Sequence, residues 1–477
     1  MADHYKISFS TARTDDDGAL REAHIEATLT PDRGRIKLIR AASDSGLYHG
    51  WAGFLTKIEA EDASGRAVAL RYEKPGVWRV VGRSRGEITL RYSMNLQHDR
   101  FLNEPGDDEL AYARPYGVMW TTRAMLMEGA PSSDIIVEFD LPDGWKVSTP
   151  WRRRSAGEAV FLPNDTDDLL DAAFMAGEHI EKSFDMGAAQ ALLALGPPVE
   201  GLSALFEPLM QGFFGAYTEL FDDSPDNNFL LIAGDASFLG GGVMGRTISL
   251  SLNEEAAGPQ GQLLAAYIIA HEGFHLWNAQ WGSQNKNAGE LEWLAEGLAE
   301  YYAFLTSVRL GLLDEEIFLG LVSERYGAYL MALASGDSLV SAAATKNTSS
   351  TSSDLIYNGG MMAALLFDLE IRRSTNGDKS LDDVVRSIHA QCANSKTELT
   401  LTDLRRLIRQ DTGVDFGVAM RKNIRRTEPF DLTAALAGAG LSADITHTDD
   451  SASIEITRAA TPSLAQETLY RAWLSGD

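Results

Sequence analysis

The segment His271-Glu272-Gly273-Phe274-His275 holds the side chains best suited to chemistry in this chain. Two histidines four positions apart lie one helical turn apart on one face, so both rings can reach the same cation. The chain has only 9 histidines, and a chance His-Glu-x-x-His segment has a probability of roughly two per cent at this composition. The Glu272 carboxylate can accept a proton from a metal-bound water. We therefore expect His271 and His275 to be metal ligands and Glu272 to be a general base.

The alternative interpretation of this segment is a pair of core histidines on an amphipathic helix. The residues before the motif, 262–270, are mostly apolar, so the histidines lie on a helix that is largely buried. A buried neutral imidazole needs hydrogen-bond partners for both ring nitrogens. Two such rings with a glutamate between them are a costly way to build a core, and we favour the metal site.

A second acidic segment begins about twenty positions later and offers a third ligand. Glu290, Glu292, Glu296 and Glu300 lie on one predicted helix, and the last three share a face because they are four apart. A buried carboxylate at Glu296 would need a cation as its partner, and Gly297 predicts close packing of the two motif helices. One carboxylate would complete three protein ligands and leave a fourth position open, as a catalytic zinc requires. The residue types alone leave the choice of carboxylate open.

The elements that must position these residues change in character along the chain. Alternating polar and apolar residues predict strands in the first third, and apolar residues at helical spacing predict helices further on. The predicted strands include 24–30, 87–94 and 134–141, and the predicted helices include 167–180, 202–221, 261–280, 289–311, 314–335 and 354–374. We expect an α+β multidomain chain. Its domains are a β-rich N-terminal domain (1–162), a mostly helical catalytic domain (163–425) with a short β insert (227–253), and a small α/β extension (426–477).

The composition narrows the classes of partner and ligand. The net charge of −26 disfavours binding to nucleic acid or to anionic membranes. The single cysteine, Cys392, excludes an intrachain disulfide and a zinc site built from several cysteines. No stretch of about 18 apolar residues is present, so we expect no transmembrane segment. The N-terminus lacks a secretory pattern, which predicts a cytoplasmic protein, or a periplasmic or secreted one if a signal peptide has been removed. The oligomeric state is left open.

The two acidic segments together resemble a known enzyme family. The stretches 271–278 (HEGFHLWN) and 292–302 (EWLAEGLAEYY) are similar to the gluzincin metallopeptidases, and most of all to the glycyl aminopeptidases, which usually carry a PDZ domain. The resemblance spans most of residues 20–440. It implies a thermolysin-like catalytic domain, one Zn²⁺ per chain and Glu296 as the third ligand. It also implies that Tyr357 donates a hydrogen bond to the oxyanion. The last fifty or so residues are too few for the remaining tail and a complete PDZ domain, so we expect none.

The same resemblance suggests further site residues. The family places a glycine-rich strand before the motif helix, which would align an extended peptide by edge pairing. The predicted substrate-binding residues in this strand are Gly241, Gly242, Val243 and Met244. Asn278 belongs to the family pattern, and Glu300 lies one turn beyond Glu296. We predict that these two residues orient the ligand histidines.

We therefore predict a zinc-dependent metallopeptidase acting on peptides, as an aminopeptidase that prefers small N-terminal residues. Related aminopeptidases hold the substrate amine with a glutamate in the glycine-rich strand, but residues 242–246 contain no acidic residue. One alternative is therefore an endopeptidase or a hydrolase of modified peptides with the same zinc chemistry. The other is a non-catalytic zinc-binding protein on a peptidase scaffold. Glu272 and Tyr357 argue against it, because neither is needed merely to hold a metal.

Overall fold

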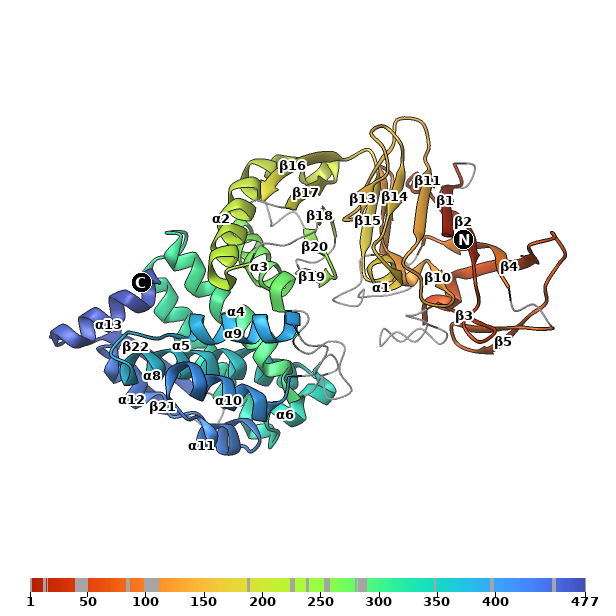
Figure 1. Ribbon diagram of the computed structural model, residues 1–477. Helices are drawn as coiled ribbons and strands as arrows, with labels where there is room; N and C mark the ends of the chain where they lie inside the picture. The colour runs from red at the N-terminus through yellow and green to blue at the C-terminus, as the bar shows by residue number, and fades with distance from the viewer. Residues whose placement is uncertain are drawn as a thin grey trace. The chain divides into compact units, whose positions relative to one another are not determined.

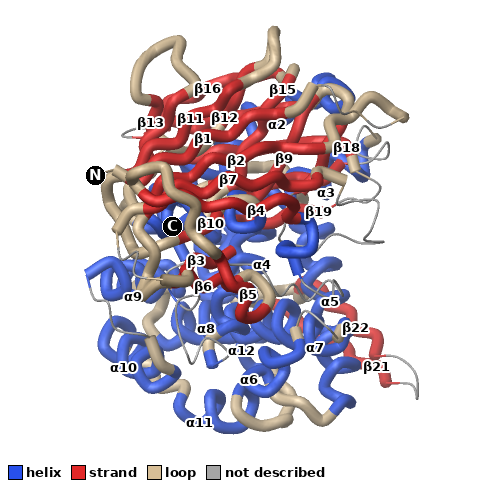
Figure 2. Tube along the Cα trace, turned by 90° about the vertical axis from the view of Figure 1, so that its right-hand side faces the viewer, coloured by secondary structure: helices blue, strands red, loops and turns tan. Residues whose placement is uncertain are grey.

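The computed structural model separates the chain into a unit built mainly of sheets and a unit built mainly of helices (Figures 1 and 2). The first unit comprises Met1–Pro208 and Pro225–Ile268, and the second comprises Leu209–Ser224 and Ile269–Asp477. The described residues are 2–476 except 12–13, 15, 39–49, 83–85, 98–110, 187–188, 224–227, 237–239, 253–257, 279–280, 282–289, 347–348, 395–398 and 448–451. The predicted order of a β-rich N-terminal region and a mostly helical C-terminal region is confirmed. The finer division at residues 162 and 425 stays a prediction, and the two compact units do not follow it.

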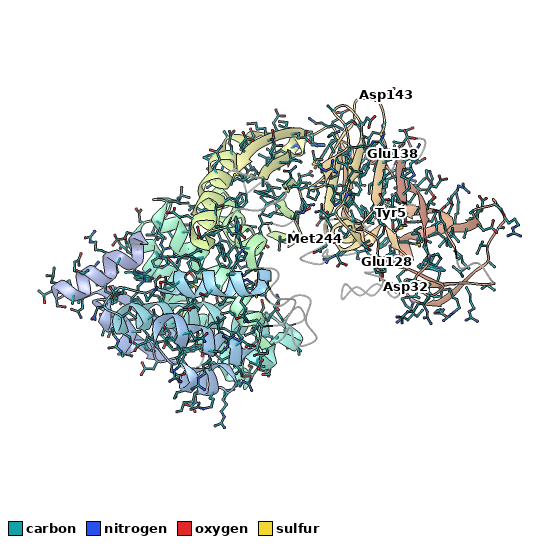
Figure 3. All side chains as sticks on the ribbon, in the orientation of Figure 1. Tyr5, Asp32, Glu128, Glu138, Asp143 and Met244 are labelled. Carbon is teal, nitrogen blue, oxygen red and sulfur yellow. The ribbon has the colours of Figure 1, made fainter. Side chains whose placement is uncertain are left out.

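Three sheets build the core of the N-terminal region. The first has the order β13-β14-β11-β1-β2-β7-β4, the second β10-β3-β6-β5 and the third β12-β15-β9-β8. Their bounds are β1 (Asp3–Phe9), β2 (Glu22–Leu29), β3 (Arg35–Leu38), β4 (Leu55–Asp62), β5 (Leu70–Lys74), β6 (Val77–Val80), β7 (Ile88–Asn95), β8 (Ala111–Arg114), β9 (Gly117–Thr121), β10 (Met127–Glu128), β11 (Ile135–Asp140), β12 (Lys146–Ser148), β13 (Arg152–Arg153), β14 (Val160–Leu162) and β15 (Ala173–Gly177). Tyr5 on β1 is fully buried and donates its hydroxyl to the Met127 carbonyl at 3.0 Å, so it links the first sheet to the second (Figure 3).

The third sheet is buried on both faces. On β9, Trp120 packs into the large N-terminal core, whereas its neighbour Met119 packs into a smaller cluster. On β15, Phe174 and Met175 divide between the two cores in the same way. A strand covered on both faces reads as a continuous apolar run without alternation. The helix predicted at 167–180 is therefore wrong, because only α1 (Thr166–Leu170) is helical there and β15 follows it.

A five-stranded sheet with the order β16-β17-β18-β20-β19 completes the first unit. Its strands are β16 (Ile180–Met186), β17 (Ala189–Leu195), β18 (Phe229–Asp235), β19 (Gly240–Met244) and β20 (Thr247–Leu252). The last three come from the segment predicted as a β insert at 227–253, of which residues 227, 237–239 and 253 lie outside the described part. Helix α2 (Ser203–Phe221) connects β17 to β18, which pair in parallel. Helix α3 (Pro259–Asn278), which carries the histidine motif, follows β20.

The second unit is a set of helices around α4 (Glu292–Arg309). It includes most of α2 and the motif part of α3. The helices that follow α4 include α5 (Glu315–Ala332), α6 (Leu339–Ala342), α7 (Ser350–Asp354), the π-helical turn η10 (Leu355–Gly359), α8 (Gly360–Ser374), α9 (Leu381–Asn394), α10 (Leu401–Thr412), α11 (Gly417–Ala419), the π-helical turn η11 (Met420–Ile424), α12 (Thr433–Gly438) and α13 (Leu464–Ser475). The strands β21 (Leu441–His447) and β22 (Ala452–Arg458) form a hairpin. Because β22 packs on α5 and α13 packs on α4 and α8, the C-terminal segment belongs to this unit.

In the described part of the chain, one helix is long and apolar enough to cross a membrane by length and composition alone, the run Glu315–Ser335 that begins with α5. Buried helices of globular cores pass the same test. Phe318, Val322 and Tyr329 of this helix are buried against neighbouring elements. Of its most apolar window, 44% is buried inside the structure, so part of the run packs within the helical unit.

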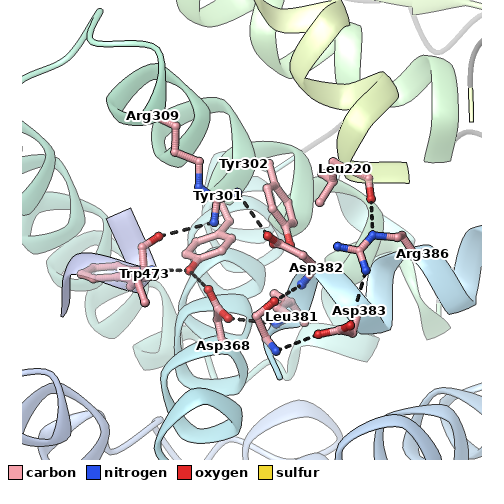
Figure 4. Close-up of polar contacts among 12 residues, drawn as sticks. Leu220, Tyr301, Tyr302, Arg309, Asp368, Leu381, Asp382, Asp383, Arg386 and Trp473 are labelled. Atoms are coloured by element: carbon pink, nitrogen blue, oxygen red, sulfur yellow. Dashed lines mark hydrogen bonds and ion pairs between the residues drawn. The ribbon is translucent and has the colours of Figure 1, made fainter. Parts of the chain in front are cut away.

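A buried polar network ties the C-terminal helix to the centre of this unit (Figure 4). Trp473 on α13 donates its indole N–H to the Tyr301 hydroxyl at 2.7 Å, and Tyr301 donates in turn to Asp368 at 2.7 Å. Next to it on α4, Tyr302 donates to Asp382 at 2.6 Å. Burial, and next the charge of the partner carboxylate, raise the pKa of each tyrosine well above its usual range. Both phenols therefore stay protonated and act as donors in the core.

Candidate metal centre and active site

Helix α3 brings the two motif histidines together on one buried face. His271 and His275 are only 5% and 8% exposed, and their Nε2 atoms lie 3.2 Å apart. Gly273 has no room for a side chain, because a Cβ there would lie 2.6 Å from the Phe214 ring of α2. Tyr217, also on α2, donates its hydroxyl hydrogen to the carbonyl oxygen of Ala270, the residue before His271, at 2.8 Å. Helix α2 therefore packs against α3 at the motif and fixes the rotation of α3 about its axis.

Glu296 on α4 supplies a third donor atom to the same point. Its Oε2 lies 3.3 Å from His271 Nε2 and 3.2 Å from His275 Nε2, so the three atoms form a nearly equilateral triangle. A tetrahedral zinc with bonds of about 2.0–2.1 Å would separate neighbouring ligand atoms by about 3.3–3.4 Å. The observed spacing fits three corners of such a site, and these residues could hold a metal ion. Within the described part of the chain, no second group of this kind is found.

The charges of Glu296 and His275 compensate each other. Burial alone would raise the pKa of Glu296, but the charge of His275 and hydrogen bonds from both histidines hold it well below its usual range. Burial alone would lower the pKa of His275, but the charge of Glu296, its hydrogen bond and the charge of Glu272 raise it to about 9. A metal ion that binds here must displace the proton from His275, so binding releases a proton.

Asn278 and Glu300 differ in how closely they approach the histidines. His275 Nδ1 lies 2.7 Å from Asn278 Oδ1, and the Asn278 amide donates to the Ala295 carbonyl at 2.9 Å. Since an amide oxygen only accepts, Nδ1 of His275 is the donor in this contact, and Nε2 is the nitrogen that can bind a metal once it has lost its proton. Glu300 Oε1 lies 3.9 Å from His271 Nδ1, which is an electrostatic contact rather than a hydrogen bond. Arg325 lies 3.8 Å from the other Glu300 oxygen.

A lysine that sequence reasoning missed reaches into the site. Lys346 Nζ donates to Glu296 Oε1 and to Glu292 Oε1, in each case at 2.6 Å. Burial alone would lower the pKa of Lys346, but the charges of Glu296 and Glu292 raise it above its ordinary value. The lysine lies fifty positions beyond Glu296 and close to a run of serine and threonine residues, so no local pattern indicates the contact. Glu292, whose side chain is 28% exposed, is thus an ion-pair partner of this lysine.

Tyr357 and Glu272, both half-buried, complete the candidate site. The Tyr357 ring lies against His271, with ring centroids 5.8 Å apart and an interplanar angle of 30°. Lys346 Nζ lies 5.4 Å from the centroid of the same ring. Tyr357 is in the π-helical turn η10, a distortion that is frequent at functional sites. Glu272 follows His271 on α3, and its charge acts on His275.

Two glycines set the approach of the helices that hold Glu296 and Tyr357. A Cβ on Gly297 would lie 2.2 Å from the carbonyl carbon of Gly360, and a Cβ on Gly360 would lie 2.1 Å from the Trp293 carbonyl oxygen. The backbones of α4 and α8 are therefore in direct contact at this crossing. The prediction that Gly297 packs the two motif helices together is corrected, because its partner is Gly360 on α8 rather than a residue of α3.

The four residues predicted to bind substrate lie on β19, which pairs with β20 at the end of the five-stranded sheet. Gly241 is required by packing, because a Cβ there would lie 2.3 Å from Ile268, three positions before His271. Met244 is buried and accepts a hydrogen bond from Thr121 at 2.7 Å (Figure 3). Its side chain belongs to a hydrophobic core cluster. The roles of the Gly241, Gly242, Val243 and Met244 backbones stay predictions.

Comparison with models of known protein families identifies two matching regions in this chain. Residues 4–178 match the Peptidase M61 N-terminal domain, and residues 265–359 match the M61 glycyl aminopeptidase domain. The two matches belong to one family and together span more than half of the chain. The chain belongs to the M61 glycyl aminopeptidase family. The predicted resemblance is thereby confirmed, and the M61 peptidase match includes His271, Glu296, Lys346 and Tyr357. Strand β19 lies outside both matched ranges.

A solved structure shares the fold of this M61 chain over most of its length. It is an aminopeptidase N family protein from Idiomarina loihiensis, with a TM-score of 0.76 and 16% sequence identity. The alignment covers 94% of the M61 chain and 80% of the other protein. A search among curated proteins found no significant match. At this identity the likeness shows a common fold and leaves the substrate undefined.

Proposed function

We propose that this M61 peptidase is a zinc-dependent aminopeptidase that prefers small N-terminal residues. The observation that supports it most is the triangle of His271 Nε2, His275 Nε2 and Glu296 Oε2, with sides of 3.2–3.3 Å. Two imidazoles and one carboxylate with a free fourth position suit zinc. A zinc ion held there would supply Lewis acidity that activates water and polarises the scissile carbonyl.

The remaining chemistry is assigned to two side chains. Glu272 follows His271 on α3 and is half-buried, so its carboxylate can accept a proton from the attacking water and deliver it to the leaving amine. Tyr357 lies against the His271 ring, and its phenol is proposed to donate a hydrogen bond to the oxyanion of the tetrahedral intermediate. Asn278 holds His275 in the tautomer that the metal requires.

The first test uses peptides with Gly or Ala at the first position, each with a free or an acetylated N-terminus. The aminopeptidase proposal predicts cleavage of the free form alone, loss of activity on chelation and recovery on zinc addition. Glu272→Gln is expected to keep the metal and to lose about 10²–10⁴-fold in kcat, the usual contribution of a general base. Glu316→Gln, at an exposed carboxylate at the start of α5, is the matched control.

One observation favours a second candidate with the same chemistry. Strand β19 carries no acidic residue that could bind a substrate amine. Equal cleavage of the free and acetylated peptides would therefore identify an endopeptidase or a hydrolase of modified peptides. Cleavage of neither peptide, with zinc bound and with Glu272→Gln indistinguishable from wild type, would instead support a non-catalytic zinc-binding protein.

A further inference from the structure

The two carboxylate oxygens of Glu296 have different partners. Oε2 faces His271 and His275 at 3.3 and 3.2 Å. Oε1 accepts a hydrogen bond from the ammonium group of Lys346 at 2.6 Å. Charge-assisted hydrogen bonds of this length are among the stronger polar contacts in proteins. The lysine therefore holds one oxygen away from the histidines while the other oxygen faces them.

The surroundings of Lys346 restrict it to this position. Its side chain is 17% exposed, and a second hydrogen bond of 2.6 Å joins it to Glu292, one turn before Glu296 on α4. The Tyr357 ring lies 5.4 Å from its Nζ, within the range of a cation–π contact. One ammonium group thus touches the third candidate ligand and lies close to the proposed oxyanion donor.

A free carboxylate at this position could bind a metal through both oxygens. Two-oxygen binding by Glu296 would occupy the position that a catalytic site must leave open for water and substrate. An ion pair on Oε1 opposes this, since it fixes the torsion of the carboxylate and engages a lone pair of the second oxygen. Partners of metal ligands commonly set ligand orientation in this way.

We propose that Lys346 is a positioning residue that limits Glu296 to one-oxygen metal binding and thereby keeps the substrate position open. The inference rests on the proposed metallopeptidase function. Lys346 does not itself contact the reacting atoms in this scheme. It acts through the geometry of Glu296, and its Nζ lies 5.4 Å from the centroid of the Tyr357 ring.

The test compares the full-length Lys346→Met and Lys346→Arg variants with wild type. Met removes the ammonium group at similar length, whereas Arg restores a cationic donor. Lys379→Met is the matched control, because Lys379 forms an exposed ion pair with Asp383 at 3.2 Å on another helix. Each protein is loaded with one equivalent of Co²⁺, and its visible absorption is recorded as a readout of coordination number. Zinc affinity by chelator competition, kcat, KM and the Tm of the metal-free protein complete the measurements.

The proposal predicts that Lys346→Met still binds one metal ion per chain and that its Co²⁺ absorption weakens as the coordination number rises. Its kcat should fall about 10–100-fold, the usual effect of losing a ligand's partner, with a smaller change in KM. Lys346→Arg should recover most of the kcat and the wild-type spectrum. Lys379→Met should match wild type in every readout.

Two results would overturn the proposal. One is a Lys346→Met spectrum and kcat indistinguishable from wild type, which would make the contact an ordinary ion pair. The other is loss of metal binding at an unchanged Tm, which would mean that Lys346 is needed for binding itself. If Lys346→Met does not fold, Lys346→Gln provides the same comparison with a shorter neutral side chain. If wild type cleaves no peptide, the proposed function fails, while the Co²⁺ spectra still decide the role of Lys346.

Discussion

Replacing Gly297 with alanine tests whether the crossing of α4 and α8 builds the active site. A Cβ at this position would lie 2.2 Å from the carbonyl carbon of Gly360 and 2.3 Å from its Cα, whereas real Cβ contacts essentially never fall below 3.0 Å. Both atoms belong to the backbone, so no side chain can rotate to make room. The two helices would have to separate by roughly 1 Å at the crossing, since packed interiors offer no void to absorb the methyl group.

The effect on function follows from the neighbours of these glycines. Glu296 directly precedes Gly297, and Tyr357 lies three positions before Gly360. A displacement of about 1 Å at a catalytic group can cost about 100-fold in rate. Overpacking of a core costs about 1–3 kcal/mol, and the upper end applies here because backbone meets backbone. We therefore expect Gly297→Ala to lose about 3 kcal/mol of stability and about 100-fold in kcat/KM.

Gly320 on α5 offers a matched control. It is exposed, and a Cβ there would meet no atom within 4 Å. Gly320→Ala should leave activity unchanged and stabilise the protein by about 0.5–1 kcal/mol, because alanine is the better helix former. Urea unfolding and peptide hydrolysis below the unfolding transition measure both quantities. A Gly297→Ala protein with the stability and kcat/KM of Gly320→Ala would refute the argument that this crossing positions the site.

Three further substitutions test other parts of the structure. Asn278→Ala should weaken zinc binding about 10–100-fold, because His275 loses the acceptor that fixes its tautomer. A zinc affinity equal to that of wild type in chelator competition would contradict this. Burial, and next the charge of Lys146, lower the pKa of His179 from 6.5 to about 4. The unfolded chain therefore binds more protons than the folded chain between these values, and stability should fall by up to about 3 kcal/mol as the pH drops through this window. His179→Gln should reduce that slope in urea unfolding of the metal-free protein, and an unchanged slope would exclude His179 as its source. Trp473→Phe should cost about 2–3 kcal/mol through the lost indole hydrogen bond and volume without changing kcat, and a stability equal to wild type would show that α13 is not held by this contact.

The parts of the site that follow from one helical turn could be predicted from the sequence. His271 and His275 are four apart, and so are Glu296 and Glu300, so each pair must share a helix face. The structure places the first pair 3.2 Å apart at Nε2, as a shared cation requires. Asn278 contacts His275 for the same reason, since three positions separate them on the same helix. These contacts depend only on the spacing of residues along one helix, and that spacing can be read from a single sequence.

Contacts between distant segments could not be predicted in the same way. Strand β15 lies between two hydrophobic cores, and burial on both faces removed the alternation that identifies a strand. Gly297 indicated a close helix contact, but its partner Gly360 lies sixty-three positions later and shows no pattern that names it. Met244 lies in a glycine-rich stretch that resembles a substrate strand, yet its side chain fills a core. Each of these outcomes depends on which surfaces meet, and a single sequence does not contain that information locally.

The acidic face of α4 requires cationic partners, although the sequence does not show which residues they are. Glu292, Glu296 and Glu300 lie four apart, and like charges at this spacing repel each other, the more so when they are buried. The groups that compensate these carboxylates come from three other elements. Lys346, from the segment before α7, reaches the first two, the α3 histidines and a metal would meet the second, and Arg325 of α5 approaches the third. Only the middle carboxylate meets two imidazoles with converging lone pairs. This convergence, which Glu292 and Glu300 lack, is what makes Glu296 the candidate metal ligand on this helix face.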